Sequence, residues 1–219
     1  MCFMLEKMAA FFEARLDNYD QHMLNDIAGA KEFYPFTAEQ LPQIPEATIL
    51  DLGCGTGLEL EYYFAQNPTA KVTGIDLSAG MLQMLKAKFS GKQLQLLQGS
   101  YFDMPLGEDC FDGAVSVESL HHFTQQEKIS LYRKLHAALK SEGYFILTDY
   151  FALSDAEEQS LRQELERLRR ETGIYDGEFY HFDTPLTVAH EMQALQIAGF
   201  TQVEILQNWG ATYCIKAVK

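Results

Sequence analysis

The sequence has no apolar run that approaches the roughly 18 residues of a membrane span. The apolar stretch at its N-terminus is too short for a secretory signal, and an acidic residue follows it at once. Closely spaced cysteines are also missing, because Cys2, Cys54, Cys110 and Cys214 lie far apart, which excludes a CxxC redox pair and a zinc knuckle built from neighbours. We therefore expect reduced thiols, a cytoplasmic protein and no membrane partner.

Basic residues are few. The chain has 17 Lys and Arg against 31 Asp and Glu, a net charge of −14, and a field of that sign repels phosphate backbones. The densest basic cluster, at 162–170, is interleaved with glutamates and indicates a solvated helix face. No nucleic-acid partner is expected, and the sequence carries no signal for an oligomeric state.

A length of 219 residues and a hydrophobic fraction of 47% predict one globular domain. Apolar runs alternate with amphipathic helical patterns, which is typical of a doubly wound, Rossmann-like α/β sheet. Only residues 207–210 separate the last two runs, so a parallel crossover is impossible there and the mostly parallel, seven-stranded sheet should include a C-terminal antiparallel strand. The expected strands are 48–53, 71–76, 93–98, 111–117, 143–149, 201–206 and 211–218.

Helices are expected between these strands and before the first one. Ser78 can cap one helix, and Thr124–Glu127 and Ser154–Glu157 are capping boxes for two others, the second ending at Gly173. A further helix should run from about Pro185 to Ala198. We therefore expect a single domain over 1–219, with a helical N-terminal cover at 1–45 and a helical and aromatic insertion at 151–185 after the fifth strand.

Three glycines follow the first expected strand in "ILDLGCGTG", residues 49–57. The third comes one position too early for a dinucleotide fingerprint, and no Lys-Ser/Thr follows it. The turn still lets a ligand approach bare backbone. Asp76 ends the next run, where a carboxylate can accept both hydroxyls of a ribose. Asp51 either caps the turn or suits a cationic group, so a nucleoside with a cationic tail is predicted.

The segments "ILDLGCGTG", "VTGIDLSAGML" and "LQGSYFDMP…FDGAVSVESLHHF" together resemble the class I S-adenosylmethionine-dependent methyltransferases over roughly residues 45–150. The resemblance implies S-adenosylmethionine as cofactor and methyl transfer as the reaction. A methyl sulfonium is already activated, so such an enzyme acts mainly by proximity and orientation. A general base is needed only where the acceptor must lose a proton.

The resemblance also implies roles for individual residues. Asp51, Gly53 and Gly55 would shape the pocket for the methionine moiety, and Asp76 would bind the ribose. Ser100 stands where many relatives have an acidic residue, which leaves adenine recognition to its hydroxyl, to backbone groups or to Asp103. The expected cofactor-binding residues are Arg15, Tyr19, Asp51, Gly53, Cys54, Gly55, Gly57, Asp76, Leu77, Met81, Ser100, Tyr101, Phe102 and Ser116.

Arg15 and Tyr19 of this set belong to the N-terminal cover. They are four residues apart, as on one face of a helix. They either close over the methionine end of the cofactor or pack on the sheet.

The methyl acceptor should lie at the carboxyl ends of the strands, near 116–122, 149–150 and 175–183. His121 and His122 offer a base or metal ligands, but adjacent side chains should diverge and no third ligand is spaced for a metal, so no metal is expected. In "EFYHFDTP", residues 178–185, Asp183 or Thr184 caps the next helix, or the segment forms a lid facing the acceptor. The candidate catalytic residues are His121, Tyr150, Tyr180 and His181.

Methyl transfer to a small-molecule acceptor is the leading hypothesis. Another transferase or a cofactor-modifying enzyme on the same scaffold is an alternative, and so is a module that binds the cofactor without turnover. Nicotinamide-dependent redox chemistry is a weaker alternative, because the glycine spacing and Asp51 argue against it.

Overall fold

One seven-stranded sheet, ordered β3-β2-β1-β4-β5-β7-β6, organises the chain. The computed structural model describes residues 5–174 and 177–219, so Cys2 and Tyr175 lie outside the described residues. All neighbouring strands are parallel except β7, which is antiparallel to β5 and to β6, as predicted. The strands are β1 (Thr48–Leu52), β2 (Lys71–Asp76), β3 (Gln93–Gln98), β4 (Phe111–Val117), β5 (Leu139–Tyr150), β6 (Gln202–Trp209) and β7 (Thr212–Val218).

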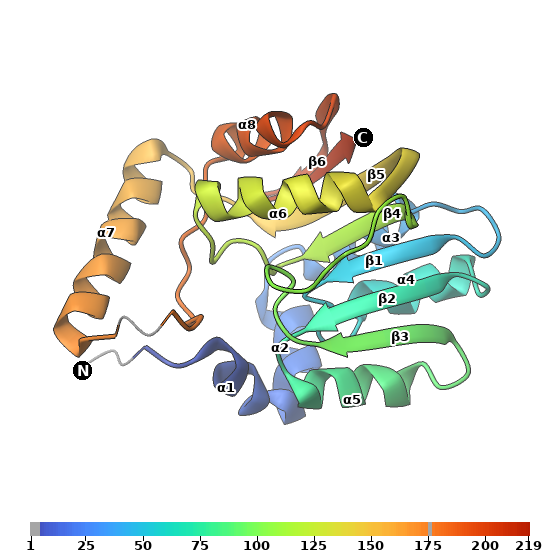
Figure 1. The fold of residues 1–219 in the computed structure, drawn as a ribbon. Coiled ribbons are helices and arrows are strands. Elements are labelled where there is room, and N and C mark those ends of the chain that lie inside the picture. Colours follow the sequence, from blue (N-terminus) through green and yellow to red (C-terminus); the bar gives the residue numbers. More distant parts are fainter. Residues whose placement is uncertain (1–4, 175–176) are drawn as a thin grey trace.

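Helices cover both faces of the sheet (Figure 1). One core cluster contains buried residues of α3 (Ala30–Glu39), α4 (Leu58–Gln66) and α5 (Ala79–Lys88). The other contains those of α6 (Gln125–Ala138) and α8 (Val188–Ala198). Because the chain reverses its winding direction between β1 and β4, the carboxyl ends of these two strands border the crevice that α/β sheets use for ligands.

The predicted helix signals largely hold. Ser78 caps α5 by accepting a hydrogen bond from Met81 N at 3.1 Å, and Thr124 and Glu127 form the reciprocal capping box of α6. At α7 (Asp155–Thr172), Ser154 accepts from Glu157 N, but the Glu157 carboxylate accepts from Leu153 N, one residue earlier than in a capping box. This helix ends at Gly173, as expected.

The predicted start of the last helix is wrong. The side chain of Thr187, not of Asp183 or Thr184, caps α8 by accepting from His190 N. Pro185 lies in the non-helical segment that precedes α8, whose backbone is bonded elsewhere: Thr184 N donates to His121 O at 3.0 Å. The tertiary contacts of 181–186 therefore override the local helix signal.

The N-terminal cover consists of α1 (Met8–Glu13), the 3-10 turn η1 (Leu16–Asn18) and α2 (Tyr19–Asp26), followed by α3. Arg15 and Tyr19 do not share one helical face, because η1 separates them. The cover and the insertion both lie at the carboxyl ends of the parallel strands (Figure 1). They are joined there, because Met8 N donates to Phe179 O and His181 N donates to Glu6 O, each at 2.9 Å.

Among the helices of the described residues, none combines the length and the apolar character needed to cross a bilayer.

Candidate active site

The glycine loop after β1 is held in a conformation that requires glycine. Gly53 and Gly55 have φ values of 75° and 47°, in the left-handed region. A Cβ on Gly53 would lie 2.0 Å from Ser119 Oγ, whereas at Gly55 the nearest atom would be Tyr19 Oη at 3.8 Å. The backbone of the loop is therefore free of side chains of its own, and side chains from the turn after β4 and from the N-terminal cover pack close to it.

Asp76, at the end of β2, joins the glycine loop to the next helix. Its Oδ2 accepts from Gly55 N at 2.9 Å and its Oδ1 accepts from Ser78 N at 2.8 Å. The side chain also borders a small cavity of about 50 Å³. This donor-side cavity is lined by Met8, Phe12, Tyr19, Gly53, Gly55, Asp76, Leu77, Met81, Tyr101, Glu118, Ser119 and His122.

Two buried carboxyl groups flank the base of the glycine loop. Asp51 in β1 and Glu59 in α4 are only 1% and 4% exposed. Burial raises the pKa of both groups, and the neighbouring Glu59 raises that of Asp51 further. Within the described residues, Asp51 Oδ2 and Glu59 Oε1 have no donor from an N–H or O–H group. Such an orphaned acidic pair fits a cationic amino group.

The N-terminal cover is bonded to this side of the sheet. Glu13 Oε2 accepts from Ser78 Oγ at 2.6 Å and from Gly80 N at 3.1 Å. Asp20 accepts from Thr56 Oγ1 at 2.5 Å and from Lys88 Nζ at 2.8 Å. These bonds bring Tyr19 to the glycine loop, where it lines the donor-side cavity.

Half of the expected cofactor residues line the donor-side cavity: Tyr19, Gly53, Gly55, Asp76, Leu77, Met81 and Tyr101. Four residues for which no binding role was predicted line it as well: Met8, Phe12, Glu118 and Ser119. For Met8 and Phe12 no local signal existed, because tertiary packing of the cover brings them there. Glu118 and Ser119 could have been predicted, because they belong to the stretch 116–122, which was expected at the carboxyl ends of the strands.

The other expected cofactor residues lie outside that lining. Ser116 Oγ donates to Leu52 O at 2.8 Å and so ties β4 to β1. Ser100 Oγ accepts from Phe102 N at 3.1 Å within a turn. The Arg15 guanidinium is exposed and stacks 3.5 Å from the centroid of the Phe11 ring. The remaining members are Asp51, Cys54, Gly57 and Phe102, of which Asp51, Cys54 and Gly57 are buried in β1 and the glycine loop.

A larger cavity of about 1010 Å³ adjoins the donor-side cavity. The two share the lining residues Phe12, Tyr19, Glu118 and His122. Its walls come from α1 and α2, from the turn after β4, from residues 181 and 183, and from the β6–β7 turn at 209–212. Of the four candidate catalytic residues, His121, Tyr150 and His181 line this acceptor-side cavity. Tyr180 is not in that lining, and its backbone pairs with Lys7 instead.

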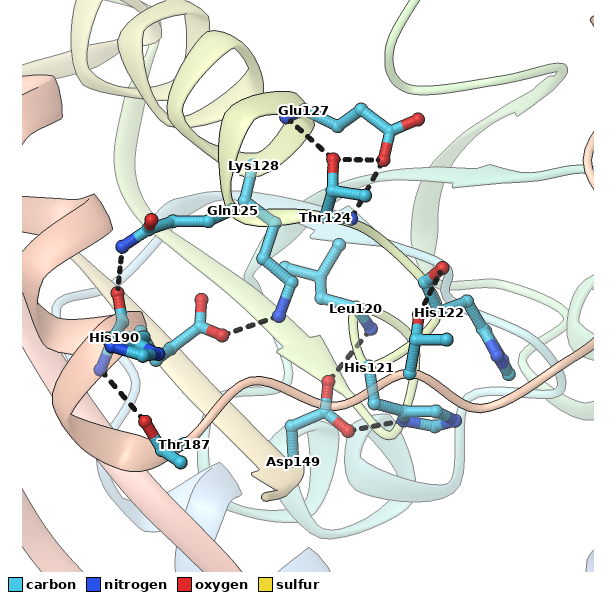
Figure 2. Close-up of polar contacts among 12 residues, drawn as sticks. Leu120, His121, His122, Thr124, Gln125, Glu127, Lys128, Asp149, Thr187 and His190 are labelled. Atoms are coloured by element: carbon cyan, nitrogen blue, oxygen red, sulfur yellow. Dashed lines mark hydrogen bonds and ion pairs between the residues drawn. The ribbon is translucent and has the colours of Figure 1, made fainter. Parts of the chain in front are cut away.

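His121 is fixed by a buried carboxylate (Figure 2). Its Nδ1 lies 2.6 Å from Asp149 Oδ1, and Asp149 Oδ2 accepts from Leu120 N at 2.8 Å. Burial opposes the charge on the His121 imidazole, but the Asp149 carboxylate outweighs it and raises the pKa of His121 to about 9. The Tyr150 ring lies 4.5 Å from the imidazole, centroid to centroid.

Asp183 is the meeting point of three imidazoles. Its Oδ1 lies 3.1 Å from His122 Nδ1, 3.6 Å from His121 Nε2 and 3.9 Å from His181 Nε2. The expectation that His121 and His122 diverge is wrong, since their ring centroids are 4.0 Å apart. Both residues lie in a turn after β4 rather than in a strand, so their side chains do not alternate. Burial lowers the pKa of His122 to about 4.

Comparisons with known proteins agree with this arrangement. The model of a methyltransferase domain family matches residues 49–143. An uncharacterized methyltransferase of Synechocystis is 34% identical over 124 residues, 57% of each chain. Human N-acetylserotonin methyltransferase in complex with S-adenosylmethionine has a TM-score of 0.63 at 21% identity, over 95% of this chain and 55% of that one. A candidate O-methyltransferase of Nostoc punctiforme has a TM-score of 0.71 at 21% identity, over 98% and 62%.

The chain shares the fold of these methyltransferase structures and has its glycine loop after β1 and Asp76 at the end of β2. The methyltransferase domain model covers residues 49–143, which is less than half of the chain. The expected fold class is confirmed, and the expected resemblance to methyltransferases is borne out over residues 49–143. In the three pairwise matches the chain spans only 55–62% of the other protein's length.

Proposed function

We propose that this protein transfers the methyl group of S-adenosylmethionine to a small molecule bound in the acceptor-side cavity. The observation that carries the proposal is the shared wall of the two cavities, formed by Phe12, Tyr19, Glu118 and His122. A donor above the glycine loop and an acceptor beyond this wall would be neighbours. Transfer by in-line displacement requires that proximity.

The residues around the donor-side cavity suit the parts of S-adenosylmethionine. Asp76 has the carboxylate oxygens for the ribose hydroxyls, and Leu77 and Met81 offer apolar surface for the adenine. Asp51, with its orphaned oxygen, suits the amino group of the methionine moiety. When bound, the cofactor supplies a methyl group already activated by the sulfonium. The protein's part is to orient it and to exclude water, for which the overlying Phe12 and Tyr19 are placed.

The acceptor-side cavity favours a small molecule over a polymer. Its volume, about 1010 Å³, is at the upper end of the range for small-molecule pockets, about 300–1,000 Å³. The cover and the insertion roof it, and the net charge of −14 disfavours nucleic acid. We place His121, Tyr150 and His181 in contact with the acceptor. A cytoplasmic location is part of the proposal, because Cys54, Cys110 and Cys214 are free thiols.

The test has a binding and a turnover arm. Calorimetry with S-adenosylmethionine should show one site, and incubation with a panel of small-molecule acceptors should yield S-adenosylhomocysteine and a methylated product. Binding without S-adenosylhomocysteine for any acceptor would indicate a cofactor-binding module instead. Release of 5′-methylthioadenosine would indicate an aminopropyl-type transferase. Either result overturns the proposal.

A further inference from the structure

We propose that His121, His122 and Asp183 form a binding site for a divalent transition-metal ion of the zinc class, in the wall of the acceptor-side cavity. Their donor atoms are His121 Nε2, His122 Nδ1 and Asp183 Oδ1, with His181 Nε2 nearby. The three residues are grouped so that one atom of each lies within 4.8 Å of the others. Two imidazoles and a carboxylate are a donor set that zinc prefers.

The distances match the edges of a coordination polyhedron. Bonds of about 2.0–2.1 Å in a tetrahedral zinc site place neighbouring donor atoms about 3.3 Å apart. Asp183 Oδ1 lies 3.1 Å from His122 Nδ1 and 3.6 Å from His121 Nε2, on either side of that value. His181 Nε2, at 3.9 Å, is in position for a fourth ligand or for a partner of a bound water.

Hydrogen bonding within the described residues explains only one of these contacts, that of His122 Nδ1 with Asp183 Oδ1 at 3.1 Å. The nitrogens of His121 and His181 are beyond hydrogen-bond distance of Asp183 Oδ1, at 3.6 and 3.9 Å. His122 Nδ1 is closer, yet it has the Phe182 carbonyl oxygen as another acceptor at 3.3 Å. Asp183 Oδ1 is itself buried without a well-aligned donor. Two of the three imidazole nitrogens therefore approach Asp183 Oδ1 without hydrogen-bonding it, which leaves a place for a cation.

Neighbouring side chains fix the orientation of His121, as is usual for a histidine that binds a metal ion. Asp149 Oδ1 lies 2.6 Å from His121 Nδ1 (Figure 2). The other ring nitrogen, Nε2, is left free for a metal and lies 3.6 Å from Asp183 Oδ1. A carboxylate on the far nitrogen is the usual partner of a metal-bound histidine. The Tyr150 ring packs against the His121 imidazole, with centroids 4.5 Å apart. The alternative grouping of Glu118, His121 and Asp149 is weaker, because both Asp149 oxygens already accept hydrogen bonds from backbone N–H groups or His121.

The site would have an open coordination position toward the acceptor, since all three ligands line the acceptor-side cavity. If the proposed methyl transfer holds, a hydroxyl or thiol of the acceptor would coordinate the ion there. Its O–H or S–H bond would break more readily, with the proton passing to water and the electron pair remaining on the oxygen or sulfur. His121 then acts as a ligand rather than as a free base.

The test begins with metal binding alone. The full chain is treated with a chelator, dialysed and titrated with Zn²⁺ by calorimetry and with Co²⁺ by visible absorption. One equivalent should bind, and Co²⁺ should show imidazole and carboxylate ligation. His122→Ala and Asp183→Asn should each weaken binding by about 100-fold or more, and Asp149→Asn, which acts through His121, by about 10–100-fold. His190→Ala is the matched control, because His190 also contacts a carboxylate, Glu158, at 2.9 Å, but lies outside the cavity lining.

No stoichiometric binding, or equal binding in the control and in the folded ligand variants, overturns the site. Far-UV circular dichroism identifies folded variants, and His122→Gln replaces His122→Ala if the latter fails to fold. Metal binding is read without cofactor or acceptor, so it can succeed where methyl transfer fails. If the metal binds but methyl transfer is the same in the chelated and reloaded enzyme, the catalytic role is wrong and the binding site remains.

Discussion

Replacing Asp76 by asparagine tests the part of the cofactor site that both sequence and structure single out. One carboxylate oxygen accepts a hydrogen bond from Gly55 N at 2.9 Å, and the other accepts one from Ser78 N at 2.8 Å. Asparagine has a single acceptor oxygen, so one N–H group loses its partner and faces an amide NH₂. A hydrogen bond to a charged group contributes about 1.5–3 kcal/mol. We expect the free energy of unfolding, measured in urea, to fall by about that amount.

Cofactor affinity should fall as well. A ribose diol donates two hydroxyls, and the variant side chain can accept at only one oxygen. The loss of one charge-assisted bond, about 1.5–3 kcal/mol, corresponds to an increase of about 10- to 150-fold in Kd. Calorimetry with S-adenosylmethionine on the folded Asp76→Asn protein measures it.

Asp112→Asn is the matched control. Asp112 accepts from Thr48 N at 2.8 Å and from Lys140 Nζ at 2.9 Å, so it also binds a backbone N–H group. It lies at the amino end of β4, away from both cavities. Its loss should reduce stability and leave cofactor affinity unchanged. Unchanged affinity in Asp76→Asn, or an equal drop in Asp112→Asn, would refute the role given to Asp76.

Three further predictions concern stability and the loop. Because burial raises the pKa of Asp51 and Glu59, the unfolded chain releases these protons at lower pH than the folded one. The contribution of this pair to the unfolding free energy should therefore be greatest below about pH 4 and decline as pH rises through the raised values; Glu59→Gln should remove this decline relative to wild type in urea titrations of the ligand-free protein. Glu191→Gln should cost about 3–5 kcal/mol in urea unfolding, because it leaves the buried Lys128 ammonium without its carboxylate partner, and a loss below 1 kcal/mol would contradict this. Gly53→Ala should lower the melting temperature and weaken S-adenosylmethionine binding, because φ is 75° and the new Cβ would clash with Ser119 Oγ; wild-type values for both would show that the loop can relax.

The strands could be predicted because each is a short apolar run with turn residues at both ends. Prediction and structure agree for β2, β3 and β4, and β5 is longer than expected because the chain enters it directly from α6. Caps were predictable where one side chain bonds its own helix, as at Ser78. The start of α8 was not, because Thr184 N is bonded to His121 O, a contact that no local pattern reveals.

The donor side of the candidate site could be predicted from local sequence patterns, whereas the acceptor side could not. The donor side depends on residues close together in the sequence, from Gly53 to Met81, so their spacing sufficed. On the acceptor side, His122 meets Asp183 only because the chain after α7 returns across the strand ends. The spacing that argued against a third metal ligand was sequence spacing, whereas ligation depends on distance in space.

Acceptor specificity should therefore reside in the cover and the insertion rather than in the glycine loop. The two segments hold each other: Met8 N donates to Phe179 O, and His181 N donates to Glu6 O. The Phe11 ring stacks on the His181 ring with centroids 3.5 Å apart. A change in either segment thus moves a wall contributed by the other, while the bonds of Asp76 to the glycine loop stay in place. Changes in the insertion are the ones expected to alter the acceptor without loss of the donor site, because Met8, Phe12 and Tyr19 of the cover also line the donor-side cavity.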